Sequence, residues 1–189
     1  MTSLVVIPGS WRTGSFNVAL ARAAIAAAPA GCTCVLESIK DIPLYDGDVE
    51  ARGTPAAVTR LKEVVAAADG VLMVSPEYNN SVPGTFKNAI DWLSRPDTDI
   101  ARVFGGRPFG LIGASPGMGG TRLSQNAWLP TLRVLGVNLY SARFFYVAGA
   151  HKVFDPSGAL VDDKTRDVLG KYMQGFGAFV AKNKRTASP

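Results

Sequence analysis

The chain has 189 residues, of which 47% are hydrophobic and 19% charged, and its formal net charge is +5. These values are typical of one globular domain, which we expect to span residues 1–189. No apolar run approaches the roughly 20 residues of a membrane helix, and no basic segment precedes the first apolar stretch, so we expect a cytoplasmic protein that does not enter a membrane. Lys and Arg are scattered except at residues 182–185, which we interpret as a solvated helix end rather than a nucleic-acid site.

Short apolar runs predict the strands. They lie at residues 4–7, 32–37, 70–75 and 109–114, and residues 138–146 form a further extended segment. Wholly apolar runs of this length are typical of parallel strands that are covered on both faces.

Helical patterns fill the intervals between these strands. They cover residues 17–28, 55–68, 83–94, 121–135 and 161–182, with Thr54 as the expected N-cap of the second helix and a long loop at residues 41–48. This alternation predicts an α/β fold, a single doubly wound five-stranded parallel sheet with helices on both faces. Ligands of such folds bind past the carboxyl ends of the strands, so the loops after the first, third and fourth strands should meet in one crevice.

The loop after the first strand, residues 9–17, offers donors that suit an anion. Its two glycines free backbone N–H groups, and polar side chains stand beside them at Ser10, Arg12, Thr13, Ser15 and Asn17. The start of the following helix adds a partial positive charge of about half a unit. Such a turn forms a phosphate site, although the same residues could form only a polar turn in which Ser15 caps the helix.

Two common nucleotide motifs do not fit this loop. In a G-x-x-x-x-G-K-[ST] loop, Ser15 would stand in place of the lysine and Phe16 in place of the metal-binding hydroxyl. In a G-x-G-x-x-G dinucleotide fingerprint, Trp11 replaces the second glycine. We therefore expect the loop to bind a terminal monophosphate.

Two further loops are rich in glycine, proline and other turn formers. Residues 75–84 follow the third strand and include the aromatic side chain of Tyr78, and residues 115–120 follow the fourth strand and contain three glycines. Glycines let the backbone approach a flat ligand closely. A phosphate cradle beside two such loops predicts a planar ring with a phosphate tail, for which flavin mononucleotide (FMN) is the candidate.

Two motifs resemble those of the NADPH-dependent FMN reductase family. Residues 9–17, GSWRTGSFN, resemble its G-S-x-R-x-x-S-x-N signature, and residues 76–92, PEYNNSVPGTFKNAIDW, resemble P-E-Y-N-x-S-x-P-G followed by K-N-A-I-D-W. Residues 41–46, DIPLYD, resemble a segment of the quinone- and chromate-reducing members. The resemblance covers most of the chain. Trp11 and residues 85–86 depart from the family pattern.

The resemblance implies a flavodoxin-like fold with strand order 2-1-3-4-5, tightly bound FMN, and a homodimer or homotetramer. The first loop would hold the FMN phosphate, and the other two loops would border the isoalloxazine. The implied cofactor-binding residues are Ser10, Arg12, Ser15, Phe16, Asn17, Pro76, Glu77, Tyr78, Asn79, Ser115 and Gly117. Glu77 is either a loop carboxylate in solvent or a contact of the ring.

The implied activity is that of an NAD(P)H-dependent FMN reductase or quinone reductase. NADPH or NADH would pass hydride to N5 of FMN and leave before an acceptor enters, such as a quinone, chromate, an azo or nitro compound, or free flavin. No catalytic side chain is expected, because the flavin carries the chemistry. Arg122 is a candidate contact of the substrate or NAD(P)H, or a bridge between subunits. The alternative function is a flavodoxin-type electron carrier, but such carriers are usually acidic, and a charge of +5 argues against one.

A few conspicuous residues have structural interpretations. Cys32 and Cys34 lie on one face of a predicted strand and are expected to pack, and His151 is expected in a surface loop, so we expect no metal site. Trp92 is expected in the core. The aromatic residues 144–146 form either an exposed patch for a second copy of the chain or an ordinary edge strand.

Overall fold

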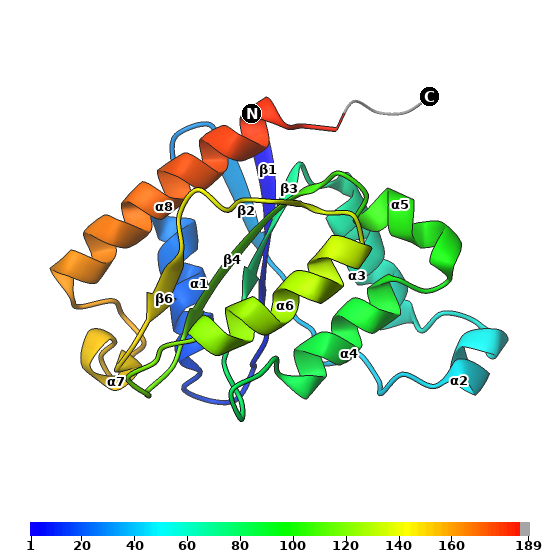
Figure 1. Ribbon diagram of the computed structural model, residues 1–189, viewed down its shortest axis with the longest axis horizontal. Coiled ribbons are helices and arrows are strands. Elements are labelled where there is room, and N and C mark those ends of the chain that lie inside the picture. Colours follow the sequence, from blue (N-terminus) through cyan, green and yellow to red (C-terminus); the bar gives the residue numbers. More distant parts are fainter. Residues whose placement is uncertain (186–189) are drawn as a thin grey trace.

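The computed structural model describes residues 1–185 and shows a parallel sheet with helices on both of its faces (Figure 1). The strands are β1 (Thr2–Pro8), β2 (Cys32–Leu36), β3 (Gly70–Val74), β4 (Pro108–Ala114), β5 (Asn138–Leu139) and β6 (Phe145–Val147). Their order is β2-β1-β3-β4-β5, with β6 also paired to β4, and every strand pair is parallel. The predicted doubly wound sheet and its strand order are confirmed, but the sheet contains a sixth short strand.

Two short strands, β5 and β6, share the edge of the sheet beside β4. β5 pairs with Pro108 and Phe109, whereas β6 pairs with residues 112–114. Between them, the phenolic oxygen of Tyr172 accepts a hydrogen bond of 3.1 Å from the backbone N–H of Leu111. The prediction of one extended segment over residues 138–146 is therefore wrong, because a buried tyrosine satisfies the backbone of β4 where a continuous strand would otherwise do so.

The long helices agree with the sequence, and the short ones do not follow from it. The helices are α1 (Phe16–Ala26), α2 (Gly47–Arg52), α3 (Ala56–Ala67), α4 (Gly84–Leu93), α5 (Ile100–Val103), α6 (Arg122–Val134), α7 (Ala150–Val153) and α8 (Asp163–Lys182), with a 3-10 turn η1 (Asp97–Asp99). The elements α2, η1, α5 and α7 are too short for a helical repeat to show in the sequence.

Three local expectations are corrected by these elements. The loop expected at residues 41–48 ends in α2, whose N-cap Asp46 accepts a hydrogen bond from the N–H of Asp48. At the start of α3 the N-cap is Pro55 rather than Thr54. His151 is exposed, as expected, but it lies in α7 rather than in a loop.

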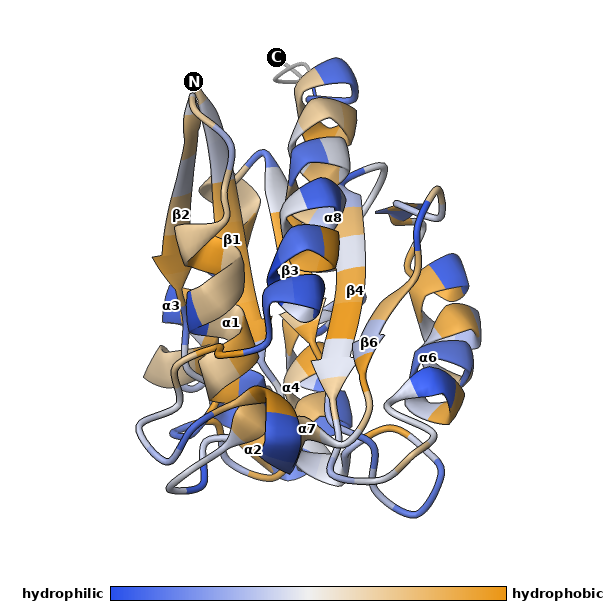
Figure 2. Ribbon diagram, turned by 90° about the vertical axis from the view of Figure 1, so that its left-hand side faces the viewer, coloured by the Kyte–Doolittle hydropathy of each residue, from blue (hydrophilic) through white to orange (hydrophobic). Residues whose placement is uncertain are grey.

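Each face of the sheet is covered by its own apolar core. One core joins α1, α7 and α8 to the sheet, and the other joins α3, α4, α5 and α6 to the opposite face. Figure 2 shows hydrophobic residues along the strands and hydrophilic residues on the outward side of α8. The side chains of β1, β3 and β4 are buried almost throughout, which explains their wholly apolar sequences.

The expectations that Cys32 and Cys34 pack and that Trp92 lies in the core are confirmed. Cys32 and Cys34 are free and half-buried against the core of α1 and α8. Trp92 is fully buried, and its indole N–H donates to the carbonyl of Pro43 over 2.9 Å. Among residues 1–185, no helix is long and apolar enough to cross a bilayer, and no cluster of His, Cys, Asp or Glu could hold a metal ion.

Candidate functional site

Three loops meet at the carboxyl edge of the sheet, at the bottom of Figure 1. Loop one (residues 9–15) follows β1, loop two (residues 75–83) follows β3, and loop three (residues 115–121) follows β4. Direct hydrogen bonds join the strand ends: the N–H of Gly9 donates to the carbonyl of Val74 over 2.9 Å, and that of Ser75 to Ile112 over 2.8 Å. The predicted convergence of these loops is confirmed.

Loop one ends as the N-cap of α1. The hydroxyl of Ser15 accepts from the N–H of Val18 over 3.4 Å and donates to the carbonyl of Ser10 over 3.1 Å. The N–H groups of Phe16 and Asn17 stand in the first turn, where a helix supplies no acceptor. Both readings of the loop are therefore compatible, since Ser15 caps the helix and the same helix start presents N–H groups that fit a terminal phosphate.

Arg12 lies at the exposed side of loop one. Its guanidinium donates to the carbonyl of Thr13 over 3.1 Å and stands 5.9 Å from the centre of the Phe16 ring. Gly14, at φ +68, makes the left-handed turn that brings Ser15 to the helix start. The arrangement leaves a cation beside the free N–H groups of α1, as a phosphate site requires.

Asn17 has a different position from the other predicted phosphate residues. Its side chain is buried, and both of its polar atoms bond the backbone of Ala114 at the end of β4. Asn17 thus fastens the start of α1 to the strand that leads into loop three. Its direct contact with a phosphate stays a prediction.

Loop two is a tight hairpin rather than an open loop. Tyr78 and Ser81 exchange two backbone hydrogen bonds of 3.2 and 3.0 Å across Asn79 and Asn80. Both asparagines have positive φ, at 50° and 59°, a conformation that asparagine tolerates better than most residues. The hydroxyl of Tyr78 donates to Oγ of Ser10 over 3.3 Å and so links this hairpin to loop one.

Glu77 binds the start of α6, a helix that lies much later in the chain. Its Oε2 accepts hydrogen bonds from the N–H groups of Leu123 and Ser124, over 2.8 and 2.9 Å, at the start of α6. A carboxylate is favoured there by the helix dipole. The structure thus gives Glu77 a role that neither alternative from the sequence includes, and its contact with a flavin ring stays a prediction.

A buried polar cluster beneath loop two is not apparent from the sequence. The hydroxyl of Ser75 accepts from the indole N–H of Trp128 over 2.8 Å and lies 3.2 Å from the hydroxyl of Ser124. Ser75 directly follows β3 and the other two side chains belong to α6, about 50 positions later, so no local pattern could reveal them. The cluster fixes α6 against the base of loop two.

Loop three is anchored at its start and open at Gly119. Ser115 accepts from the N–H of Gly117 through its hydroxyl, over 3.2 Å, and from the N–H of Ala150 in α7 through its carbonyl, over 3.0 Å. A side chain at Gly119 would meet no atom within 4 Å, so this stretch of backbone faces open space. Arg122 is exposed at the first position of α6, next to this loop.

Trp11 is the residue of loop one that departs from the family pattern. It packs against the core of α3 and α4, and within residues 1–185 its buried indole Nε1 has no hydrogen-bond partner. A cavity of about 250 Å³ adjoins it, between loop one, residues 39–44 and the start of α4. The only sequence signal at this position is a tryptophan where the family pattern often has a smaller side chain.

Comparisons with known proteins agree with this geometry. The sequence profile described as NADPH-dependent FMN reductase matches residues 2–152. An NAD(P)H-dependent FMN reductase of Pseudomonas aeruginosa is 40% identical over 176 residues, which cover 93% of this chain and 94% of the relative. A quinone reductase of Escherichia coli K12 is 40% identical over 185 residues, with 96% of each chain covered. The solved structure of FerB, a flavoenzyme NAD(P)H:(acceptor) oxidoreductase of Paracoccus denitrificans, is similar with a TM-score of 0.88 and 32% identity, over 98% of this chain and all of that one.

Proposed function

The chain belongs to the NADPH-dependent FMN reductase family, and we propose that it oxidises NADPH or NADH and reduces quinones or similar acceptors. The observation that carries the proposal is the meeting of a helix start suited to one terminal phosphate with two loops of exposed backbone at one edge of the sheet. FMN has one terminal phosphate and a planar ring, so this donor set fits it.

The proposed contacts divide between the three loops. Loop one and the first turn of α1 would hold the phosphate, through Ser10, Arg12, Ser15, Phe16 and Asn17. Loops two and three would border the ring, largely through backbone atoms, at Pro76, Glu77, Tyr78, Asn79, Ser115 and Gly117. FMN, when bound, supplies the chemistry of accepting a hydride and passing electrons on.

The protein's own contribution is position and electrostatics. The hairpin of loop two is held by Tyr78 at its flank and by Glu77 at its base, so the backbone donors there are fixed before any ligand arrives. Pre-oriented donors stabilise charge that develops during a reaction without the cost of rearrangement. We therefore assign no side chain the role of an obligatory acid or base.

The site is open enough for a reductant and an acceptor to use in turn. Tyr78 is 47% exposed and Met118 is 85% exposed, and both belong to the loops that would border the ring. We propose a ping-pong scheme in which the nicotinamide leaves before the acceptor binds in the same space. Quinones are the first candidates, with chromate, azo and nitro compounds and free flavin as further ones.

Steady-state kinetics with a panel of acceptors and both pyridine nucleotides tests this proposal. Double-reciprocal plots for NADPH at several concentrations of 1,4-benzoquinone should be parallel, and high quinone should inhibit. Intersecting lines would contradict the shared space. No turnover with any acceptor would favour an FMN electron carrier instead.

We also propose that the protein forms a homodimer or homotetramer. Phe144 is 72% exposed and Tyr146 is 41% exposed, whereas Phe145 between them is buried against the sheet. The exposed pair flanks a shallow cavity of about 320 Å³ that Lys164 and Val168 of α8 also line. Exposed apolar surface of this kind marks contact with other molecules. Light scattering at micromolar concentration should give at least twice the monomer mass, and a monomer would refute this proposal.

A further inference from the structure

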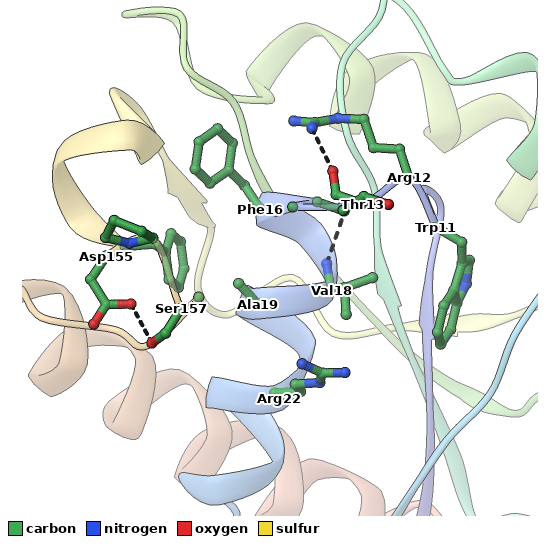
Figure 3. Close-up of a pocket in the computed structure, with 14 residues that line it drawn as sticks. Trp11, Arg12, Thr13, Phe16, Val18, Ala19, Arg22, Asp155 and Ser157 are labelled. Carbon is green, nitrogen blue, oxygen red and sulfur yellow. Dashed lines mark hydrogen bonds between the residues drawn. The ribbon is translucent and has the colours of Figure 1, made fainter.

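A cavity of about 430 Å³ lies on the outer side of loop one and α1 (Figure 3). One wall is formed by residues 11–16 and continues along α1 as far as Arg22, and the other by residues 154–158. The volume is within the range of small-molecule sites. The cavity shares Arg12, Ser15 and Phe16 with the proposed phosphate cradle, but it extends beyond that cradle along α1 to Arg22.

The lining combines flat apolar surface with positive charge. The rings of Phe16 and Phe154 stack with centroids 6.2 Å apart and planes inclined by 28°. Figure 3 shows Arg12 beside the start of α1 and Arg22 farther along the same helix. An aromatic wall with cations at its edges suits a planar ring that carries phosphate groups.

Asp155, the acidic side chain of this lining, already accepts hydrogen bonds from its own loop. Asp155 accepts hydrogen bonds from the hydroxyl of Ser157, over 2.6 Å, and from the N–H of Ala159, over 2.9 Å. These hydrogen bonds hold the pKa of Asp155 below its usual value, and the bond from Ser157 has the largest effect. Asp155 therefore stays a carboxylate. Because Arg12 is proposed to bind the FMN phosphate, the guanidinium of Arg22 is the cation of this lining that remains for a second ligand.

Arg22 is too far along α1 to serve the FMN phosphate. It lies six positions after Phe16, which is about 9 Å along a helix axis. The helix FNVALARAAIA contains no acidic residue that could pair with it, and Arg22 is exposed among alanines. The guanidinium of Arg22 is therefore accessible to an anionic ligand.

We propose that this cavity receives the adenosine half of NADPH and that Arg22 binds its 2′-phosphate. The inference rests on the proposed function and adds to it the residue that would favour NADPH over NADH. The adenine would lie against the ring of Phe16, which is backed by the buried ring of Phe154, and the guanidinium of Arg22 would contact a phosphate group that NADH lacks. Arginine suits this role because its planar fork donates two parallel hydrogen bonds to phosphate oxygens.

Calorimetric titration of the FMN-loaded protein with three probes tests the site without turnover. We expect adenosine 2′,5′-bisphosphate to bind about tenfold to a hundredfold more tightly than 5′-AMP, as one charge-assisted contact allows. Inorganic phosphate should bind more weakly than either nucleotide. Equal affinity for the two nucleotides would overturn the proposal, and inorganic phosphate as tight as the bisphosphate would show a plain anion site instead.

Variants then assign the effect to one residue. Arg22→Ala should remove the preference for the bisphosphate and lower the ratio of kcat/KM for NADPH to that for NADH by a similar factor. Arg22→Lys should keep part of the preference. Arg133→Ala, an exposed arginine at the end of α6, is the matched control and should keep all of it. An unchanged preference in a folded Arg22→Ala protein would overturn the proposal.

The two proposals fail in distinguishable ways. Oxidation of NADPH and NADH with no bisphosphate preference would leave the proposed function standing and remove the role of Arg22. A bisphosphate preference in a protein that oxidises neither nucleotide would keep the pocket and remove the reductase.

Discussion

The side chain of Asn17 pairs with both backbone polar atoms of Ala114. Its Oδ1 accepts from the N–H of Ala114 over 2.9 Å, and its Nδ2 donates to the carbonyl over 2.8 Å. The pair joins the first turn of α1 to the last residue of β4, 97 positions later in the chain. The first turn of α1, where we propose the phosphate site, and the strand that leads into loop three are therefore held together by one buried amide.

Replacing this amide should destabilise the whole fold. Asn17→Ala leaves the buried N–H and carbonyl of Ala114 without partners, each at a cost of about 1–3 kcal/mol. Urea denaturation should show a lower free energy of unfolding by that order. Asn126→Ala, at an exposed position of α6, should change little. Equal stability of the Asn17 and Asn126 variants would show that the pair contributes nothing.

Removing the charge of Arg12 should weaken FMN binding. A charge-assisted hydrogen bond is worth about 1.5–3 kcal/mol, so Arg12→Ala should raise the FMN dissociation constant about tenfold to a hundredfold. The apoprotein should still fold, because Arg12 is exposed. Fluorescence titration of the apoprotein with FMN at moderate salt measures the constant, and Arg52→Ala in α2 serves as the control. An unchanged constant would place Arg12 outside the phosphate site.

Glu77 should matter for stability more than for chemistry. Glu77→Ala removes the acceptor of two N–H groups at the start of α6 and should cost about 0.5–2 kcal/mol, the range of a lost helix cap. Glu77→Gln keeps an acceptor and should cost less. With FMN fully bound, Glu77→Gln and Tyr78→Phe should each retain turnover to within about a thousandfold. A larger loss would mean that one of these side chains transfers a proton.

Acid should weaken the fold partly through Asp99. The hydrogen bond from Lys62, whose ammonium is almost completely buried 2.9 Å away, lowers the pKa of Asp99. An acid with a lowered folded-state pKa adds stability that is present above its unfolded pKa of about 4 and is lost as the pH falls through the folded value.

The variant Asp99→Asn isolates this contribution. Its free energy of unfolding should depend less on pH below about 4 than that of the wild type. Asp97→Asn, at an exposed position two residues away, should keep the wild-type slope. Identical slopes for all three proteins would show that Asp99 does not contribute to the acid sensitivity of the fold.

The sequence predicts what depends on local pattern. The buried strands appear as apolar runs, and the glycines and hydroxyls of loop one predict a turn suited to a phosphate, because each signal lies within a few residues. The hairpin of loop two is different. Its two asparagines are visible as turn formers, but the bond from Tyr78 to Ser10 depends on how β1 and β3 lie side by side.

Contacts between distant elements are what the sequence does not reveal. The carboxylate of Glu77 reaches the start of α6, and Ser75 reaches Trp128, only because β3 and β4 are neighbours in the sheet. The break between β5 and β6 has the same origin, since Tyr172 of α8 takes the place of a strand residue. A local sequence pattern does not reveal partners that lie so far apart in the chain.

The central claim is that this chain uses FMN to oxidise NADPH or NADH and to reduce an acceptor. The most direct test is anaerobic addition of NADPH, or of NADH in a parallel run, to the purified protein, followed by 1,4-benzoquinone, while the flavin absorbance is recorded. The account predicts a yellow protein that releases FMN on denaturation, loses its flavin absorbance with a pyridine nucleotide and regains it with the quinone. A flavin that stays oxidised with both nucleotides, or one that proves to be FAD, would contradict it.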